Sequence, residues 1–412
     1  MSKKDPRIAV VGGGIGGLTL ALALRQRGVD ADVFEQAPEL AEIGAAVALS
    51  ANATRELRRL GVLDGITAAS TEPSELIYRD WRSGRRIAAH PVHQDLRYQT
   101  RFGAPYYGIH RADLQRVLGA ALGGAGLHLG HRLARLDDRG DGVVLGFDNG
   151  RSVRADVVVG ADGVRSMVRR WVTGGEGVVY SGTSAFRGIV PVERLPSLPD
   201  PLAIQFWMGP DAHLLHYAIG GGGEHVNFFA VTEGPREWPN PERWQIEAAP
   251  GEAVAAFAGW HPAVTEMVGA GWVTTRWGLF VVRQPRRWYR GRAVLMGDAA
   301  HAMLPHHGQG ANTTIEDAIT LAELLPGASS GTWDEVMDRY HALRRARTRT
   351  IQRSSWATNA LLHLPDGPAL KGRDERVARF PERFGWIHEF DALHTASGPE
   401  QAAREQGARA AS

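Results

Sequence analysis

The sequence predicts an α/β protein in which a parallel-sheet domain is interrupted by a second, β-sheet-rich domain and is followed by a C-terminal helical segment. Three observations support this fold class. The first 36 residues read as strand, glycine loop, helix and strand. Two later apolar strands run into turns that contain Gly and Asp, at 155–163 and 292–298. Between these landmarks, the segments 76–92 and 213–231 have the pattern of β-hairpins.

Length and composition exclude several classes of protein. At roughly 150 residues per domain, the 412 residues suggest two or three domains, and a hydrophobic content of 43% supplies their cores. The 47 Lys and Arg nearly balance the 45 Asp and Glu, so no strong field recruits nucleic acid. Without Cys there is no disulfide, thiolate nucleophile or Cys-ligated metal. We expect a cytoplasmic protein, because no signal peptide and no apolar run of about 18 residues is evident.

The N-terminal segment has the order of a dinucleotide-binding βαβ unit. Arg7–Val11 is a continuous apolar run, as expected of a strand buried on both faces. The pattern Gly12-x-Gly14-x-Gly16-Gly17 follows and leads into a helix. Glycines at this place allow a tight turn, a close approach of the backbone to a pyrophosphate, and close packing of helix on sheet. The free N–H groups of the helix N-terminus attract the phosphates.

The second strand, Ala31–Phe34, ends in a candidate ribose ligand. Glu35 lies 23 residues after Gly12, where a carboxylate can accept hydrogen bonds from ribose hydroxyls. An ordinary surface glutamate is the alternative. Strand, glycine loop, helix, strand and acid together predict a Rossmann-like domain.

Motifs far apart in the chain identify the dinucleotide more closely. In chain order they are His110-Arg111-Ala112-Asp113-Leu114, Gly160-Ala161-Asp162-Gly163-Val164-Arg165-Ser166, Phe186-Arg187-Gly188, Gly297-Asp298-Ala299-Ala300-His301, Gly308-Gln309-Gly310-Ala311-Asn312 and Glu316-Asp317-Ala318. With the glycine loop, they make the sequence resemble the single-component FAD-dependent aromatic hydroxylases, the group of 4-hydroxybenzoate hydroxylase. Within that group it is most similar to salicylate hydroxylase and 6-hydroxynicotinate 3-monooxygenase.

The resemblance implies a noncovalently bound FAD and a set of residues that hold it. The glycine loop, Glu35 and the adjacent Gln36 would bind the ADP half, and Arg111 the phosphate and ribityl region. Asp298 would bond a ribityl hydroxyl, and Asp162 is associated with both FAD and the nicotinamide cofactor. The backbone of Gly310, Ala311 and Asn312, which opens a helix, would face the pyrimidine edge of the flavin, where a helix N-terminus stabilises negative charge.

The reaction implied by the resemblance is hydroxylation of a small aromatic acid or phenol. NADH or NADPH reduces the flavin, O₂ adds to form a C4a-hydroperoxide, and the ring of the substrate attacks it. Because the chain has one convincing Rossmann fingerprint, NAD(P)H is expected to dock transiently without a domain of its own. No metal is expected, because the histidines lack ligand spacing. The protein is expected to be a monomer or a homodimer.

Three side chains are candidates for the catalytic site. His213 and Tyr217 fall on one face of an expected strand, where an imidazole and a phenol can bind and deprotonate a phenolic substrate. A shift of the strand by one residue, with His216 inward, is the alternative. His306 matches a histidine near the substrate in the nicotinate and salicylate enzymes. His301 is expected to be structural, packed behind Asp298.

The expected domains follow from these motifs. Residues 1–72, 98–175 and 275–330 would form the FAD-binding domain, and residues 73–97 and 176–274 the substrate domain. Residues 331–395 form a helical segment, with a long arginine-rich helix over 333–363, and residues 396–412 a disordered tail. Two other functions remain open: a flavin-dependent tailoring hydroxylase or epoxidase of a larger polycyclic or quinone metabolite, and a flavin-binding redox sensor.

Overall fold

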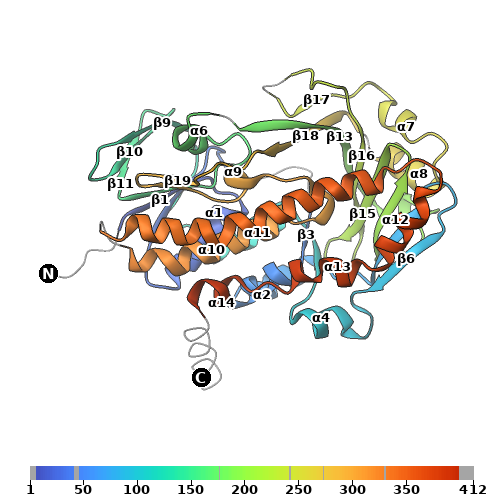
Figure 1. Cartoon of the computed structure of the whole chain (residues 1–412), viewed down its shortest axis with the longest axis horizontal. Coiled ribbons are helices and arrows are strands. Elements are labelled where there is room, and N and C mark those ends of the chain that lie inside the picture. Colours follow the sequence, from blue (N-terminus) through green and yellow to red (C-terminus); the bar gives the residue numbers. More distant parts are fainter. Residues whose placement is uncertain are drawn as a thin grey trace.

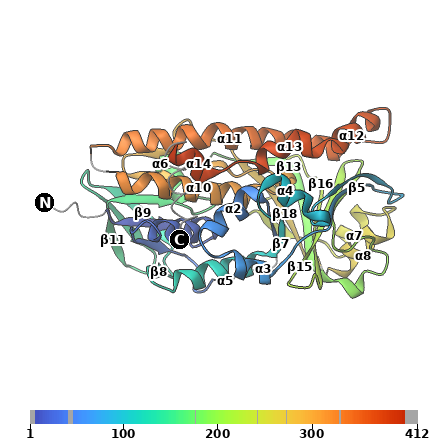
Figure 2. The same cartoon turned by 90° about the horizontal axis from the view of Figure 1, so that it is seen from below.

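The computed structural model of the protein describes residues 6–40, 46–175, 177–240, 243–271, 273–328 and 331–398. Two large sheets lie next to one another, one near each end of the molecule, and the long helix α11 (Trp333–Leu362) runs past both (Figures 1 and 2). The arginine-rich helix predicted over 333–363 is therefore confirmed. No helix in the described ranges is both long and apolar enough to cross a membrane.

The first sheet is the predicted parallel sheet. Its strands, in spatial order, are β19 (Tyr289–Arg290), β20 (Ala293–Leu295), β12 (Val157–Gly160), β1 (Ile8–Val11), β2 (Ala31–Phe34) and β8 (Leu127–His128). All neighbours run parallel except β19 and β20. Val10 of β1 lies between Val159 and Val33, and all three are fully buried. Burial on both faces explains why the central strands β1 and β12 are apolar throughout.

The second sheet combines strands from distant parts of the chain. In spatial order they are β17 (Gln245–Glu247), β18 (Thr275–Val282), β13 (Val178–Pro191), β16 (His225–Glu233), β15 (Ala212–Ile219), β14 (Ile204–Gly209), β5 (Glu75–Asp80) and β6 (Arg86–Pro91). Both predicted hairpins, β5–β6 and β15–β16, are confirmed as antiparallel pairs. The pair β5–β14 is parallel and joins Leu76 to Ile204.

Two details of the predicted domain boundaries are wrong. Thr275–Val282 was expected in the nucleotide-binding domain, but as β18 it pairs with β13 in the second sheet. The first sheet resumes only at β19. The tail expected from Ala396 also begins later, because α14 (Ala392–Ser397) includes Ala396, which is fully buried. Residues 399–412 of that tail lie outside the described residues.

Two small antiparallel sheets complete the strands. One contains β11 (Ser152–Ala155), β10 (Val143–Phe147) and β9 (Leu133–Asp138), and the other contains β3 (Ala46–Leu49), β7 (Tyr107–His110) and β4 (Ser70–Thr71). The remaining α-helices are α1 (Ile15–Arg25), α2 (Ala51–Arg59), α3 (Leu63–Ala68), α4 (Arg97–Phe102), α5 (Arg111–Leu122), α6 (Met167–Thr173), α7 (Glu252–Ala256), α8 (Pro262–Ala270), α9 (Asp298–His301), α10 (Gly310–Leu324), α12 (Ala369–Ala378) and α13 (Phe380–His388).

A buried cluster of charges joins α10 to α11. Arg344 of α11 donates from Nε to Oδ1 of Asp317 and from Nη2 to Oε2 of Glu316, each at 2.6 Å, and all three side chains are fully buried. Arg347 adds two hydrogen bonds to the carboxylate of Glu316, at 2.8 and 2.7 Å. Burial alone would raise the pKa of Glu316, but the charges of Arg347 and Arg344 hold it below its ordinary value.

Asp317 connects this cluster to the turn after β20. Its Oδ2 accepts from the N–H of Gly297 at 2.8 Å and from Nε2 of His301 at 2.6 Å. Although burial opposes ionisation, the charges of His301 and Arg344 lower the pKa of Asp317. His301 is therefore structural, as predicted, and it fixes the turn that carries Asp298.

We predict that Arg344→Met destabilises the protein by about 3–5 kcal/mol, because it leaves buried carboxylates without their partner. Urea unfolding measures the change. Arg349→Met is the matched control, since Arg349 is an exposed arginine of the same helix, and it should shift stability by less than about 0.5 kcal/mol. Equal stability of the two variants would show that the buried cluster does not hold α11 in place.

Candidate active site

Three of the four glycines in the pattern Gly12-x-Gly14-x-Gly16-Gly17 are required by packing. A Cβ on Gly12 would lie 2.4 Å from the carbonyl oxygen of Ala161, and Gly12 has a φ of +110°. A Cβ on Gly17 would lie 2.0 Å from the oxygen of Gly12, and one on Gly16 would lie 2.4 Å from Thr314 of α10. These glycines therefore bring β1, β12, α1 and α10 close together.

Gly14 has a different role, because a Cβ there would meet no atom within 4 Å. Gly14 is the N-cap of α1, and no side chain caps this helix. The N–H groups of its first turn are thus next to open space, as a bound pyrophosphate requires. The lack of a side chain at Gly14 keeps that space free.

Glu35 is held by the loop itself. Its Oε2 accepts from the N–H of Gly13 at 2.7 Å, and its Oε1 accepts from the N–H of Ala37 at 2.8 Å. A carboxylate has about four acceptor sites, so two hydrogen bonds leave capacity for ribose hydroxyls. Gln36, the next residue, is exposed.

Arg111 is the first residue of α5. Gln115, which lies on the same face of this helix, contacts the glycine loop. Gln115 donates from Nε2 to the carbonyl oxygen of Gly13 at 2.9 Å. Residues four apart share one face of a helix, so Arg111 lies on the side of α5 that turns toward the loop. Gln115 was missed in the sequence, where a lone glutamine in an amphipathic helix carries no signal.

The carboxylate of Asp162 points to α6 rather than to open space. It accepts from the hydroxyl of Ser166 and from the N–H groups of Met167 at 2.7 Å and Val168 at 3.1 Å. Burial raises the pKa of Asp162, while these hydrogen bonds oppose the shift. The side chain thus caps a helix, and any contact of this residue with a cofactor stays a prediction.

Asp298 stands out by its exposure. It follows Gly297, whose φ is +58°, and it is exposed although Gly297 and Ala299 on either side are buried. A carboxylate presented from a buried turn is suited to accept a hydrogen bond from a ligand hydroxyl. The turn is fixed from behind by Asp317, as described above.

The start of α10 also borders open space. A Cβ on Gly310 would meet no atom within 4 Å. The side chain of Asn312 is fully used, because Oδ1 accepts from Ser50 N at 2.9 Å and Nδ2 donates to Ala48 O at 2.8 Å. Only the backbone of Gly310, Ala311 and Asn312 is therefore suited to face a ligand, with the positive end of the helix.

These features fit the FAD that the sequence implies. A helix N-terminus next to open space would hold the pyrophosphate, Glu35 the ribose, and Asp298 a hydroxyl of the ribityl chain. The uncapped start of α10 would face the pyrimidine edge of the flavin. Gly12, Gly16 and Gly17 are required by the packing of the protein itself, so their presence is explained without a cofactor.

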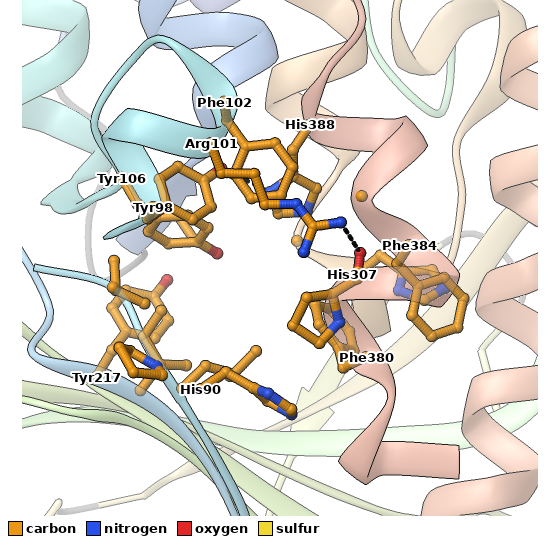
Figure 3. Close-up of a pocket in the computed structure, with 18 of the residues that line it drawn as sticks. His90, Tyr98, Arg101, Phe102, Tyr106, Tyr217, His307, Phe380, Phe384 and His388 are labelled. Atoms are coloured by element: carbon orange, nitrogen blue, oxygen red, sulfur yellow. Dashed lines mark hydrogen bonds between the residues drawn. The ribbon is translucent and has the colours of Figure 1, made fainter. Parts of the chain in front are cut away.

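A cavity of about 280 Å³ lies between the second sheet, α4 and α13. Tyr98, Tyr106 and Tyr217 line one side of it, and Phe380 and Phe384 lie across from them (Figure 3). Its other lining groups include the basic side chains Arg97, Arg101, His90, His306, His307 and His388. No Asp or Glu lines the cavity in the described ranges. The cavity is thus aromatic and basic.

His306 and Tyr217, both predicted from the sequence, line this cavity. His306 is buried, and neither of its ring nitrogens has a hydrogen-bond partner within the described residues. Burial lowers the pKa of His306 and raises that of Tyr217. His306 is therefore a neutral imidazole with a free lone pair, and Tyr217 is a protonated phenol that can donate a hydrogen bond but cannot act as a base.

His213 does not line the cavity. It is on the face of β15 that was predicted, with Leu215 and Tyr217 toward the cavity, so the alternative with His216 inward is wrong. Its ring centroid is 5.0 Å from that of His306, and its Nδ1 is hydrogen-bonded to Nε2 of His363 at 2.7 Å. His213 thus lies behind His306.

Several lining residues had no signal in the sequence, because they come from α4 and α13, far from every motif. Tyr98 of α4 accepts from the N–H of Ala51 at 3.0 Å, and its hydroxyl is hydrogen-bonded to Nδ1 of His388 at 2.6 Å. Burial lowers the pKa of His388 to about 3, so this ring is neutral. Arg101 donates to the carbonyl oxygen of Pro381 at 3.0 Å (Figure 3).

The comparisons with known proteins agree with this geometry. Residues 5–355 match the family model described as "FAD binding domain". The chain is 41% identical over 390 residues to 3-amino-4-hydroxybenzoate 2-monooxygenase of Streptomyces cremeus, covering 94% of this chain and 96% of that one. It is 35% identical to 6-hydroxynicotinate 3-monooxygenase of Pseudomonas fluorescens, covering 85% and 91%.

A solved structure extends the likeness to three dimensions. The substrate complex of a salicylate hydroxylase superposes with a TM-score of 0.82 at 28% sequence identity, covering 96% of this chain and 98% of that one. The predicted resemblance to the salicylate and 6-hydroxynicotinate enzymes is therefore confirmed, and the amino-hydroxybenzoate enzyme was not foreseen. The chain belongs to the FAD-binding-domain family and is an FAD-dependent aromatic-ring monooxygenase.

Proposed function

We propose that this enzyme uses NAD(P)H and O₂ to hydroxylate a single-ring aromatic acid that carries a ring hydroxyl, such as an amino-hydroxybenzoate. One observation supports the substrate class above all. The cavity combines aromatic walls, an unpartnered neutral imidazole at His306 and a guanidinium at Arg101, with no lining acid in the described ranges. Such a lining favours a flat anion with a phenolic group. The relatives named for amino-hydroxybenzoate and hydroxynicotinate act on molecules of this kind.

Size argues against the larger substrates. The cavity of about 280 Å³ lies at the lower end of ligand pockets, which span roughly 300–1,000 Å³. A polycyclic or quinone metabolite needs a wider site than a single substituted ring. The tailoring function is therefore the weaker alternative.

Each lining group has a role in this proposal. His306 accepts a hydrogen bond from the phenolic O–H and takes up its proton, which makes the ring a better nucleophile. Tyr217 donates a hydrogen bond, and Arg101 binds the carboxylate. FAD, when bound, supplies the activation of oxygen. The aromatic walls exclude water from the reacting ring.

The cofactor residues remain those expected from the sequence, with one refinement. Glu35, Gln36 and the glycine loop would hold the ADP half of FAD, Arg111 its phosphate and ribityl region, and the backbone at Asn312 the pyrimidine edge. The refinement is that Asp162 would contribute through the turn it braces. Because NAD(P)H is supplied in the cytoplasm, we place the enzyme there.

The direct test is a substrate panel. Purified holoenzyme is mixed with NADH or NADPH and with 3-amino-4-hydroxybenzoate, 6-hydroxynicotinate or salicylate. We expect at least one of these acids to stimulate cofactor oxidation about tenfold or more and to yield a product heavier by one oxygen atom, or by one oxygen less CO₂ if the carboxylate is lost. Turnover that stays at the ligand-free rate with every acid would favour the redox sensor.

A second prediction concerns the cofactor. Asp298→Ala removes the exposed carboxylate and should weaken FAD binding about tenfold, the loss expected for one hydrogen bond to a charged group. The FAD content after gel filtration and a titration of the apoprotein measure it. Asp64→Ala, an exposed acid on α3, is the control and should retain FAD fully.

A third prediction concerns the carboxylate of the substrate. Arg101→Gln should raise KM for 3-amino-4-hydroxybenzoate about tenfold, because a charge-assisted hydrogen bond is lost. KM for 2-aminophenol, which lacks the carboxylate, should not change. Arg376→Gln removes an exposed arginine from α12 and should behave as the unmodified enzyme. An equal loss for both ligands in Arg101→Gln would assign Arg101 to the shape of the cavity instead.

A further inference from the structure

A histidine that no motif singles out lines the cavity at the outer edge of the second sheet. It is His90 of β6, the last strand of that sheet. His90 pairs with Leu76 of β5, which pairs in turn with Ile204 of β14. Paired residues of neighbouring strands share one face of a sheet, and all three of these residues line the cavity. The register of the strands therefore places His90 on the cavity side.

The hydrogen bond of His90 fixes which ring nitrogen carries the proton. Its Nε2 lies 2.8 Å from the carbonyl oxygen of Val377. A carbonyl oxygen can only accept, so Nε2 carries the hydrogen and donates it. Burial lowers the pKa of His90, although the hydrogen bond to Val377 and the charge of Glu382 oppose the shift. The ring is therefore neutral at physiological pH, and its Nδ1 is a lone pair that can only accept.

The surroundings of His90 hold its ring in this orientation. Val377 is in the last turn of α12, where carbonyl oxygens commonly accept from donors outside the helix. The ring centroid of His90 is 6.2 Å from that of Phe380 and 6.3 Å from that of Tyr78. Because Nδ1 and Nε2 point to different sides of an imidazole, the bond to Val377 directs Nδ1 away from α12. Figure 3 shows His90 at the border of the open centre of the cavity, across from Arg101.

Two other histidines of the cavity lining are not fixed in this way. Nδ1 of His388 is hydrogen-bonded to the hydroxyl of Tyr98 at 2.6 Å. Nε2 of His307 is hydrogen-bonded to the hydroxyl of Ser354 at 2.9 Å. A hydroxyl can donate or accept, so neither bond determines which nitrogen of these rings carries the proton. Of the three rings, that of His90 is the one that a carbonyl oxygen fixes as an acceptor toward a ligand.

A fixed acceptor at this place can select among aromatic acids. Arg97 and Arg101 only donate hydrogen bonds, so they suit a carboxylate but cannot accept from an amino group. The tyrosine hydroxyls of the lining can donate or accept, so they do not discriminate. No Asp or Glu lines the cavity in the part of the chain that the structure describes. An amino group on an aromatic ring is uncharged at neutral pH, so the neutral Nδ1 of His90 is a sufficient partner for it.

We propose that His90 determines specificity for aromatic acids that carry an N–H donor on the ring, by accepting a hydrogen bond from that donor at Nδ1. This inference rests on the proposed function, because it names a substituent that the same cavity selects. An acid with a methyl group in place of the amino group fills the same space but leaves the lone pair of Nδ1 unpaired. A polar group that a ligand covers without pairing it costs binding free energy, so the methyl-substituted acid should bind less tightly.

The experiment compares a matched pair of acids, 3-amino-4-hydroxybenzoate and 4-hydroxy-3-methylbenzoate. The holoenzyme with oxidised flavin is titrated with each acid, and the change in flavin absorbance gives the dissociation constant. We expect the unmodified enzyme to bind the amino-substituted acid about tenfold more tightly, the difference expected for one hydrogen bond that is made or left unmade. Binding is measured without turnover, so the different reactivity of the two rings does not enter the comparison.

Two variants replace the two nitrogens of the imidazole separately. In His90→Gln the amide nitrogen can take the place of Nε2 and donate to Val377, but nothing replaces Nδ1. In His90→Asn the amide oxygen can take the place of Nδ1, but the bond to Val377 is lost. His90→Gln should bind the amino-substituted acid about tenfold more weakly and the methyl-substituted acid unchanged, whereas His90→Asn should retain the preference. The matched control His225→Gln, an exposed residue at the start of β16, should bind both acids like the unmodified enzyme.

The outcomes separate this inference from the proposed function. If neither acid binds, the inference is overturned, and the proposed function fails as well if the other acids of the substrate panel do not bind. If the unmodified enzyme binds both acids equally well, the inference alone is overturned. Equal weakening of both acids in His90→Gln also overturns it, because His90 then only shapes the cavity. Should His90→Gln not fold, His90→Leu, which removes both nitrogens, decides by the same ratio of dissociation constants.

Discussion

The ion cluster of Glu316, Asp317, Arg344 and Arg347 is the constraint on which the arrangement of the expected FAD-binding residues depends. Taking such charges out of water is costly, and only a full set of partners offsets the cost. The buried cluster is therefore expected to form as a whole or not at all. Asp317 then fixes the turn before Asp298, while Glu316 accepts from Asn52 of α2 at 2.6 Å. One buried network thus sets the positions of α9, α10, α2 and α11 around the place where the flavin would lie.

The cavity between the second sheet, α4 and α13 differs from the ion cluster, because its buried histidines are neutral. His306, His307 and His388 are buried there, no acid lines the cavity in the described part of the chain, and burial lowers the pKa of His307 to about 4 and that of His388 to about 3. These rings are neutral at physiological pH, so they can bind a ligand by hydrogen bonds rather than by charge. Paired ions thus fix the elements around the expected FAD site, whereas neutral rings and aromatic walls form the cavity.

The parts of the fold that depend on local pattern could be predicted from the sequence. The glycine loop, the hairpins and the long helix follow from the spacing of residues and the period of the apolar pattern. The same alternation predicted which face of β15 carries Tyr217. The side of the cavity formed by Tyr98, Arg101 and His388 could not, because α4 and α13 meet only in the tertiary structure. Asp162 shows a second limit, since a motif names a residue but does not say that its side chain caps a helix.

Helix α11 has a mechanical consequence. Its 30 residues make a rod of about 45 Å that is anchored to α10 through Arg344, to β18 through Gln352 and to β15 through its cap at His363. A hinge rotation of one sheet against the other would have to break either the anchorage to α10 or both anchorages to the second sheet. Helix α11 thus ties the two sheets to one another over its whole length, whereas α4 and α13 meet beside the cavity through two short contacts, Tyr98 with His388 and Arg101 with Pro381.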